Sequence, residues 1–250
     1  MSKMTNRNGL SKVLNTARDL LFPPRCVGCG ELMEPFVSVP TVFCPLCRTA
    51  WEAAITEAAG QSAEDAERGL VYLTFYRSGE TDGIPEHLIY HIKHQGDRRT
   101  FSFVAERLAP RLLSAAATLP TRAPAGEDKP LLFTYPPRRR SAVSKDGFDQ
   151  AARLAKALAV ACEGEFAALI RRTQRGRAEQ KHLNADERAQ NAVSAYVLSD
   201  KAPEAVRDRT VVICDDLCTT GATLNRCAAL LVEAGARSVI LCTVARTGKE

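Results

Sequence analysis

The sequence lacks any apolar run long enough to cross a membrane. It also lacks a segment typical of a signal peptide, because the apolar stretch Leu10–Phe22 is short and is interrupted by Lys12, Arg18 and Asp19. These two absences predict a cytoplasmic protein in a reducing environment with no membrane span. The nine cysteines are therefore not expected to form a disulfide framework.

The sequence also shows no strong charge imbalance and no internal repeat. The formal net charge of +5 permits a polyanionic ligand or a nucleic acid, but it requires neither. With 250 residues, of which 45% are hydrophobic, the chain can bury a full core. We expect one α/β domain with a small appendage.

The most informative stretch is V-V-I-C-D-D-L-C-T-T-G-A-T at 211–223. Its four apolar residues Val211–Cys214 predict a buried strand of a parallel sheet, and Asp215 and Asp216 are expected at the C-terminal end of that strand. A loop of small hydroxyl residues with one glycine follows. From Leu224 to Gly235 the apolar positions recur at helical spacing, so the stretch predicts a strand, a loop and a helix in succession.

This arrangement predicts a phosphate site, because backbone N–H groups at a helix N-terminus bind phosphate. The two acids would repel a bare phosphate, so the ligand must also offer hydroxyl groups or a divalent cation. A ribose 5-phosphate meets both demands, with its 2′- and 3′-hydroxyls on Asp215 and Asp216. The structural alternative is an acidic turn capped by threonine, without a ligand. The candidate loop residues are Cys218, Thr219, Thr220, Gly221, Ala222 and Thr223.

The same stretch resembles the 5-phosphoribosyl-1-pyrophosphate (PRPP) fingerprint of type I phosphoribosyltransferases. The resemblance implies Mg²⁺-dependent transfer of a 5-phosphoribosyl group, with pyrophosphate leaving from C1. Asp215 and Asp216 would then be catalytic, because they hold the ribose hydroxyls and favour the cation that develops on the ribose. Mg²⁺ would bridge pyrophosphate and ribose oxygens.

Near the N-terminus, two C-x-x-C pairs supply Cys26, Cys29, Cys44 and Cys47. This spacing is typical of a tetrahedral zinc site. A redox pair, an iron–sulfur site and coincidence are the alternatives. No spare histidine lies nearby in the sequence, and the four cysteines fill a tetrahedral site, so a zinc ion held here would be structural. The remaining cysteines, at 162, 214, 218, 227 and 242, have apolar surroundings that indicate packed thiols.

Strands that alternate with helices from residue 131 onward predict a mainly parallel sheet. The polar stretch 171–190 is expected to be an exposed mobile loop. His87 and His91, four residues apart on a predicted helix, could chelate a metal, but the lack of a third ligand favours surface histidines. Strands are predicted at 70–76, 131–135, 166–170, at 193–198 as an edge strand and at 238–244 closing the sheet, and helices at 10–22, 84–94, 101–117 and 147–161, with a helix or connector at 51–68.

Several motifs resemble the ComF family of competence-associated, phosphoribosyltransferase-like proteins. The motifs are L-F-P-P-R-C-V-G-C-G at 21–30, I-K-H-Q-G-D-R at 92–98, G-F-D-Q-A-A-R-L-A at 147–155 and R-T-Q…Q-K-H-L…E-R…N over 172–191. The resemblance implies a tail and helix at 1–24, a zinc ribbon with a connector at 25–68 and a phosphoribosyltransferase-like domain at 69–250.

By the same resemblance, the loop after Tyr135 faces the pyrophosphate and the stretch 172–191 closes over the ligand as a hood. This chain departs from the usual R-G-F-N-Q motif, because it carries Asp146 and Asp149 where members carry arginine and asparagine. That exchange of charge would weaken pyrophosphate binding unless other cations compensate. The candidate cations are Arg138, Arg139, Arg140, Lys145, Arg172 and Arg188.

Three functions remain open on the sequence. The first is an enzyme that transfers phosphoribosyl to an unknown acceptor. The second is a module that binds single-stranded DNA during uptake, together with competence machinery. Its support is the ComF resemblance, the zinc ribbon and the basic stretch 171–181, although no aromatic residue for base stacking lies in 171–191. The third is a sensor that binds PRPP without turnover.

Overall fold

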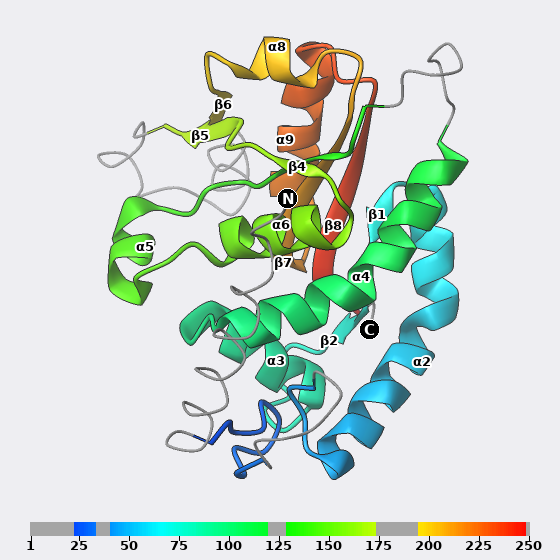
Figure 1. Ribbon diagram of the computed structural model, residues 1–250, viewed down its shortest axis with the longest axis vertical. Coiled ribbons are helices and arrows are strands. Elements are labelled where there is room, and N and C mark those ends of the chain that lie inside the picture. Colours follow the sequence, from blue (N-terminus) through cyan, green and yellow to red (C-terminus); the bar gives the residue numbers. More distant parts are fainter. Residues whose placement is uncertain (1–22, 34–40, 120–128, 174–194, 249–250) are drawn as a thin grey trace, which may run out of the picture.

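The computed structural model describes residues 23–33, 41–119, 129–173 and 195–248 (Figure 1). The sequence predictions for 10–22, 121–128 and 174–191 lie outside these residues. The helices are α2 (Pro45–Glu67), α3 (Ile84–His94), α4 (Arg98–Thr118), α5 (Arg140–Asp146), α6 (Gln150–Ala161), α8 (Ala202–Val206) and α9 (Ala222–Glu233). The strands are β1 (Leu70–Val71), β2 (Thr74–Tyr76), β3 (Leu132–Thr134), β4 (Glu165–Phe166), β5 (Ile170–Arg172), β6 (Tyr196–Leu198), β7 (Thr210–Cys218) and β8 (Ser238–Thr247).

The main sheet is parallel and has the strand order β1-β8-β7-β3-β4, with β2 also paired to β8. Val212 at its centre lies opposite Ile240 of β8 and Phe133 of β3. The predicted fold class, an α/β fold with a mainly parallel sheet flanked by helices, is confirmed. The prediction that 238–244 closes the sheet is wrong, because the earlier strands β1 and β2 pair with the outer side of β8.

The strand predicted at 70–76 forms in two parts, β1 and β2, which keep a single register along β8. Two other strands differ from prediction. The segment 166–170 divides between β4, at the edge of the main sheet, and β5. β6 does not join the main sheet as an edge strand, because it pairs antiparallel with β5 in a separate two-stranded sheet.

The two faces of the main sheet pack against different helices. Val212 and Cys214 of β7 belong to the core shared with α4 and α6, whereas Val211 and Ile213 belong to the core shared with α9. Successive side chains of a strand point to opposite faces, so each apolar residue of β7 has a buried place on one side or the other. Figure 1 shows α9 and α6 on opposite sides of the central strands.

Residues of the cysteine-rich segment extend the larger core. Phe43 lies against the ring of Trp51 on α2, with centroids 5.5 Å apart, and edge-on to Phe103 of α4. Met33 and Cys47 are buried in the same core. The segment therefore packs on the sheet-bearing part through shared apolar contacts. The predicted domain boundary after residue 68 stays a prediction.

Helix starts are set by capping residues. α6 begins at Gln150, three residues later than predicted, because the side chain of Asp149 accepts hydrogen bonds from the backbone N–H groups of Ala151 and Ala152. Asp97 caps α4 in the same way through the N–H of Thr100. The long α2 starts at Pro45, so the uncertain connector predicted at 51–68 is helical.

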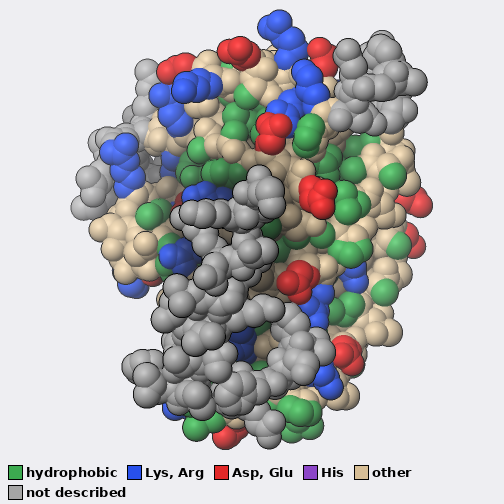
Figure 2. All heavy atoms as spheres, in the orientation of Figure 1, with side chains coloured by type: hydrophobic (Ala, Val, Ile, Leu, Met, Phe, Trp, Pro, Cys, Tyr) green, Lys and Arg blue, Asp and Glu red, His purple; other side chains and the backbone are tan. Residues whose placement is uncertain are grey.

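On the face shown in Figure 2, Lys and Arg side chains are scattered among acidic and apolar ones. Within the described part of the chain, no helix combines the length and the apolar character that a membrane span requires.

The core between α6 and the sheet gives a testable prediction. Leu154 on α6 is fully buried, so Leu154→Ala should lower the free energy of unfolding by about 2–5 kcal/mol through lost burial and the cavity left behind. Val160 on the same helix is 82% exposed, and Val160→Ala should change stability by less than about 0.5 kcal/mol. Urea unfolding of both variants measures the difference. Equal stability losses would contradict the packing of α6 described above.

Candidate functional site

The acid pair lies within β7. The sequence analysis placed Asp215 and Asp216 just after the end of this strand. That prediction is wrong, because the strand runs from Thr210 to Cys218 and both acids lie inside it. The reason is that β8 continues to pair with β7 beyond the acids, with Leu217 opposite Ala245 and Cys218 opposite Arg246. Because strand side chains alternate, Asp216 points to the α6 side of the sheet and Asp215 to the α9 side.

Asp216 is only 6% exposed and is contacted by two helices. The ammonium group of Lys93, near the end of α3, lies 3.8 Å from its Oδ2. Gln150, the first residue of α6, donates from Nε2 to the same oxygen at 3.4 Å. A buried carboxylate needs such partners, because an unpaired charge away from water is costly. The site thus brings together one residue each from α3, α6 and β7.

Asp215 is less fully compensated. Its Oδ1 accepts a hydrogen bond of 2.9 Å from the backbone N–H of Asp216. Desolvation raises the pKa of Asp215 well above its ordinary value, and the adjacent charge of Asp216 adds to the increase. Burial and the adjacent acid therefore both disfavour the ionised form of Asp215.

On the α9 side of the sheet, Asp215 influences the pKa of two neighbouring side chains, Tyr196 and Cys227. The phenol of Tyr196 accepts a hydrogen bond of 2.7 Å from the Arg172 guanidinium. Burial raises the pKa of Tyr196, and the charge of Asp215 contributes to that shift. Burial likewise raises the pKa of Cys227 on α9 to about 12, again with a contribution from Asp215. Arg172, a predicted hood residue, is thus held on this side of the acid pair.

The predicted phosphate loop connects β7 to α9. Thr219 and Thr220 are exposed, and Gly221 has φ +73°, in the left-handed region that favours glycine. Gly221 precedes the first residue of α9, so the free N–H groups of the first helical turn face this loop. The Ala222 N–H lies 3.4 Å from the Thr220 hydroxyl oxygen. The loop therefore offers backbone donors and threonine hydroxyls at the same end of β7, a few residues beyond the acids.

Asp146 and Asp149, the two acids that depart from the motif of the ComF resemblance, both have structural partners. Asp146 accepts a hydrogen bond of 2.8 Å from the guanidinium of Arg138. Asp149 accepts a bond of 2.9 Å from the Arg138 backbone N–H and caps α6. The charge of Arg138 is therefore already balanced within the protein.

The other predicted cations are distributed differently. Arg139, Arg140 and Lys145 are exposed at the start of α5 and along it. α5 was not predicted from the sequence. Arg188 lies outside the described residues, as does most of the predicted hood. Of the candidates that the structure describes, none forms a hydrogen bond or an ion pair with Asp215 or Asp216.

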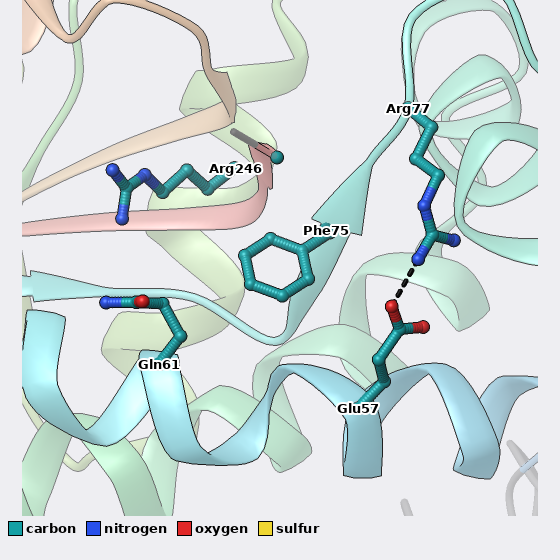
Figure 3. A pocket seen from close by; sticks show the side chains of 6 residues that line it. Glu57, Gln61, Phe75, Arg77 and Arg246 are labelled. Atoms are coloured by element: carbon teal, nitrogen blue, oxygen red, sulfur yellow. Dashed lines mark hydrogen bonds and ion pairs between the residues drawn. The ribbon is translucent and has the colours of Figure 1, made fainter. Parts of the chain in front are cut away.

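A small pocket lies near the C-terminal ends of β2 and β8. It encloses about 220 Å³ and is lined by Glu57, Gln61, Phe75, Arg77, Arg246 and Gly248. In Figure 3, Arg77 points across its rim toward Glu57, while the Phe75 ring faces the interior. Arg246 pairs with the buried Asp65, which also accepts a bond from the Tyr72 hydroxyl. The pocket was not predicted from the sequence.

Sequence reasoning missed two residues of the acid site, Lys93 and Gln150. Both lie in motifs that carry the family resemblance, 92–98 and 147–155, so their sequence context was visible. Their convergence on Asp216 was not visible, because 66 residues separate Gln150 from the acid and still more separate Lys93 from it.

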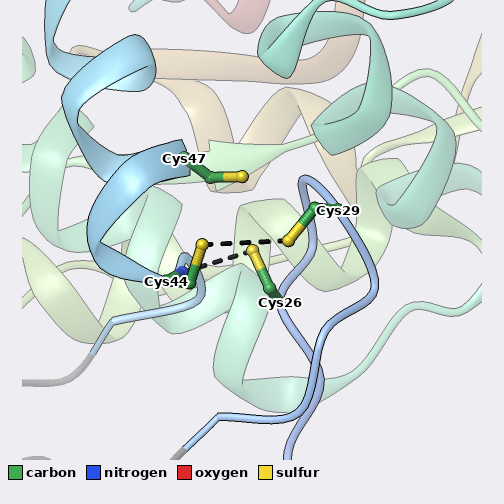
Figure 4. A group of neighbouring side chains, drawn as sticks. All are labelled: Cys26, Cys29, Cys44 and Cys47. Atoms are coloured by element: carbon green, nitrogen blue, oxygen red, sulfur yellow. Dashed lines mark hydrogen bonds between the residues drawn. The ribbon is translucent and has the colours of Figure 1, made fainter.

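The four predicted metal ligands meet in space. Sγ atoms of Cys26, Cys29, Cys44 and Cys47 all lie within 4.8 Å of one another (Figure 4). Sγ of Cys29 and Sγ of Cys44 are 3.8 Å apart, the separation expected between two thiolates on one tetrahedral zinc at about 2.3 Å each. The cluster could therefore hold zinc.

The surroundings of the cluster also suit a metal. Burial opposes ionisation of Cys26, but hydrogen bonds from backbone N–H groups, that of Cys44 foremost, lower its pKa to about 7. Burial and the neighbouring thiols raise the pKa of Cys47, so a cation would be needed to ionise all four. A Cβ at Gly28 would lie 2.8 Å from the Cys47 sulfur, which leaves room for glycine alone.

The histidines of α3 have other roles. His87 contacts the Gly28 carbonyl through Nδ1 and the Thr81 carbonyl, at 2.8 Å, through Nε2. His91 Nδ1 lies 3.4 Å from the Thr100 hydroxyl and from Asp97 Oδ2. The metal-chelating alternative therefore has no support among the residues described.

The five remaining cysteines are packed thiols, as predicted. Four of them are fully or nearly buried, and Cys162 is half-buried. Burial raises the pKa of Cys162 to about 11 and that of Cys214 well above its ordinary value. Such thiols are poor nucleophiles and poor metal ligands.

Comparisons with known proteins agree with this geometry. Residues 142–250 match the family model described as the phosphoribosyl transferase domain. A comparison with curated proteins gave no match.

Among solved structures, the allosteric regulatory enzyme of purine biosynthesis shares 15% identity at a TM-score of 0.38, over 62% of this chain and 30% of that one. Glutamine phosphoribosylpyrophosphate amidotransferase from B. subtilis shares 15% at 0.33, over 65% and 28%. A hypoxanthine phosphoribosyltransferase from Trypanosoma cruzi shares 13% at 0.35, over 58% and 67%. This chain thus spans less than a third of the first two.

At these identities and TM-scores, the solved structures say nothing about activity. The family match covers the segment that contains α6, the acid pair, the threonine loop and α9. Residues 142–250 therefore carry a phosphoribosyltransferase-like domain, built on a mainly parallel sheet flanked by helices.

Proposed function

We propose that the protein binds PRPP with Mg²⁺ and transfers its 5-phosphoribosyl group to an acceptor. The observation that carries this proposal is the arrangement at the end of β7. Two neighbouring carboxylates near the end of β7, one of them with a raised pKa, are followed after Leu217 and Cys218 by a threonine loop at the N-terminus of α9. The match of residues 142–250 to the phosphoribosyl transferase domain supports it.

Each part of the site has a proposed role. Backbone N–H groups from Cys218 to Ala222, with the hydroxyls of Thr219, Thr220 and Thr223, bind the 5′-phosphate. Asp215 and Asp216 accept hydrogen bonds from the ribose hydroxyls, and their charge favours the cation that develops at C1 as pyrophosphate departs. Mg²⁺, when bound, neutralises pyrophosphate oxygens; in such sites it takes most of its ligands from the substrate and water.

The finer identity is also a proposal. The motifs at 21–30, 92–98 and 147–155 favour a ComF-like protein of the cytoplasm, linked to DNA uptake. The four-cysteine cluster would hold one structural zinc, since it offers four protein ligands and no open position. The acceptor of the phosphoribosyl group remains to be identified.

One observation favours a second function, a sensor that binds PRPP without turnover. Arg138, a candidate for the leaving group, already pairs with Asp146. Without a cation for pyrophosphate, binding through the ribose and the 5′-phosphate would persist while transfer would be slow. Steady release of pyrophosphate on addition of candidate acceptors distinguishes the enzyme from the sensor.

A titration separates both functions from binding of single-stranded DNA. PRPP with Mg²⁺ and a single-stranded oligonucleotide are titrated in parallel at two salt concentrations. Counterion release makes nucleic-acid affinity fall steeply with salt. Tight, strongly salt-dependent DNA binding with no PRPP binding would replace the proposed function.

Removing the acid charges should weaken PRPP binding. Asp215→Asn and Asp216→Asn keep the side-chain shape but remove the acceptor charge, so each should cost about 1.5–3 kcal/mol of binding, or roughly ten- to a hundredfold in affinity. Glu233→Gln, at the exposed far end of α9, is the matched control and should bind as the wild type does. Calorimetric titration measures all three. Unchanged affinity in both acid variants would make the fingerprint structural.

Asp215 should also make stability depend on pH. Because its pKa is raised in the folded protein, the stability it contributes is fully present below the ordinary carboxyl pKa of about 3.9 and is lost as pH rises through the folded value. Asp215→Asn removes this loss. The melting temperature of the variant should therefore exceed that of the wild type at pH 7, and the two should converge at low pH. A constant difference across pH would contradict the burial argument.

Purified protein should contain about one zinc per chain, measured by elemental analysis. Cys29→Ser should lower this content, because it removes one of four ligands, whereas Cys162→Ser, outside the cluster, should leave it unchanged. Folded wild-type protein without zinc, prepared without chelator, would refute the assignment.

A further inference from the structure

Lys93 is the only basic side chain that the structure, over its described residues, shows paired with an acid of the site. Its Nζ lies 3.8 Å from Asp216 Oδ2, and its side chain keeps about a third of its surface exposed. α3, which carries it, precedes the segment that matches the phosphoribosyl transferase domain. Lys93 therefore comes from outside the matched domain, whereas its partner Asp216 lies within it.

The charges around Lys93 suit a polyanionic ligand. PRPP brings a 5′-phosphate and a pyrophosphate next to two carboxylates, so the site needs cations. Arg138 is already paired with Asp146, whereas the separation of Lys93 from its partner is longer than a hydrogen bond. An ammonium group held loosely beside Asp216 can turn to a ligand oxygen with little loss of existing contacts.

Gln150 supplies an independent sign of a ligand at this place. Its side chain is 95% buried, and its Oε1 has no hydrogen-bond partner, while Nε2 reaches Asp216. A buried amide oxygen without a partner costs free energy that a ligand donor or a bound water would recover. The unsatisfied atom lies beside the carboxylate that Lys93 contacts.

α3 connects this place to the four-cysteine cluster. In its first turns, Ile84 packs against Gly28, where a Cβ would lie 2.8 Å from Ile84 Cδ1, and His87 contacts the Gly28 carbonyl. Gly28 lies between the ligands Cys26 and Cys29. The helix is thus held at one end by the first C-x-x-C pair, about two turns from Lys93.

The other end of α3 is held against α6. Gly96, just past the helix, has φ +56° and touches the ring of Phe148, so closely that a Cβ would collide with it. The Arg153 guanidinium of α6 donates to the Gly96 carbonyl and stacks on the same ring. Lys93 is therefore fixed between two anchors, the cysteine cluster and the start of α6.

We propose that Lys93 binds the pyrophosphate group of the ligand, and that the four-cysteine cluster positions Lys93 through α3. This inference rests on the proposed function. In the absence of ligand, Lys93 balances Asp216. When PRPP binds, the ribose hydroxyls take over Asp216, and the ammonium group donates to a pyrophosphate oxygen while Gln150 Oε1 accepts a bond at the ribose.

The first experiment tests the role of Lys93 by calorimetric titration with two probes, PRPP with Mg²⁺ and ribose 5-phosphate. Lys93→Gln should weaken PRPP about ten- to a hundredfold and ribose 5-phosphate less than about threefold. Lys93→Arg, which keeps the charge, should restore most of the PRPP affinity. Lys201→Gln, exposed on the turn before α8, removes the same charge elsewhere and should have no effect.

The second experiment tests the coupling through α3. His87→Phe removes the contact with the Gly28 carbonyl but leaves the four cysteines, and His94→Phe on the same helix is the control, since His94 contacts Tyr90 instead. His87→Phe should weaken PRPP severalfold in the wild type and add little in Lys93→Gln, because both changes act through one group. Zinc content and thermal melts show that each variant is folded.

The outcomes distinguish a failure of the proposed function from a failure of the role assigned to Lys93. If the wild type binds neither probe, the proposed function fails. If the wild type binds PRPP but Lys93→Gln binds it equally well, or loses both probes equally, the role of Lys93 is overturned. Additive losses in the double variant would overturn the coupling and leave Lys93 as a binding residue on its own.

Discussion

The structure depends on one constraint: β7 is covered on both faces, and two adjacent carboxylates lie within it. Because side chains alternate along the strand, the two carboxylates point to opposite faces of the sheet. Asp216 contacts Lys93 and Gln150, whereas Asp215 accepts a hydrogen bond from a backbone N–H and is desolvated by its neighbours. Adjacent like charges in a buried strand oppose folding unless something compensates them. The helices around β7 therefore both complete the core and set the charge balance of the site.

This constraint explains why segments far apart in the chain meet at one place. α3 comes from the N-terminal half, α6 follows β3 and α5, and α9 follows the loop after β7. Only at the C-terminal end of β7 do all three approach the acid pair, as expected for parallel sheets, in which ligands bind beyond the carboxyl ends of the strands. The four-cysteine cluster contributes Cys26 and Cys47 to the same core as Trp51 of α2 and Phe103 of α4.

Asp146 and Asp149, which stand where the ComF resemblance leads one to expect arginine and asparagine, illustrate how a local exchange is accommodated. Asp149 caps α6, a role that asparagine would fill equally well. Asp146 pairs with Arg138, so the charge of that guanidinium is already balanced within the protein. Both exchanged residues thus have partners within the protein, and under the proposed function the supply of positive charge, including Lys93, would decide between transfer and binding alone.

Local pattern was sufficient for much of the fold and of the site. Periodicity, capping residues and spacing, which act over a few residues, predict the bounds of α3, the start of α9 near the loop glycine, the parallel sheet and the meeting of four cysteines.

What the sequence by itself could not determine was pairing across long stretches of chain. The inner position of β8, the separate β5-β6 sheet, the extension of β7 past the acids and the convergence of Lys93 and Gln150 on Asp216 were decided by tertiary structure. The physical reason is that strand order and side-chain convergence depend on which surfaces are buried together, a property of the whole core and of no single segment.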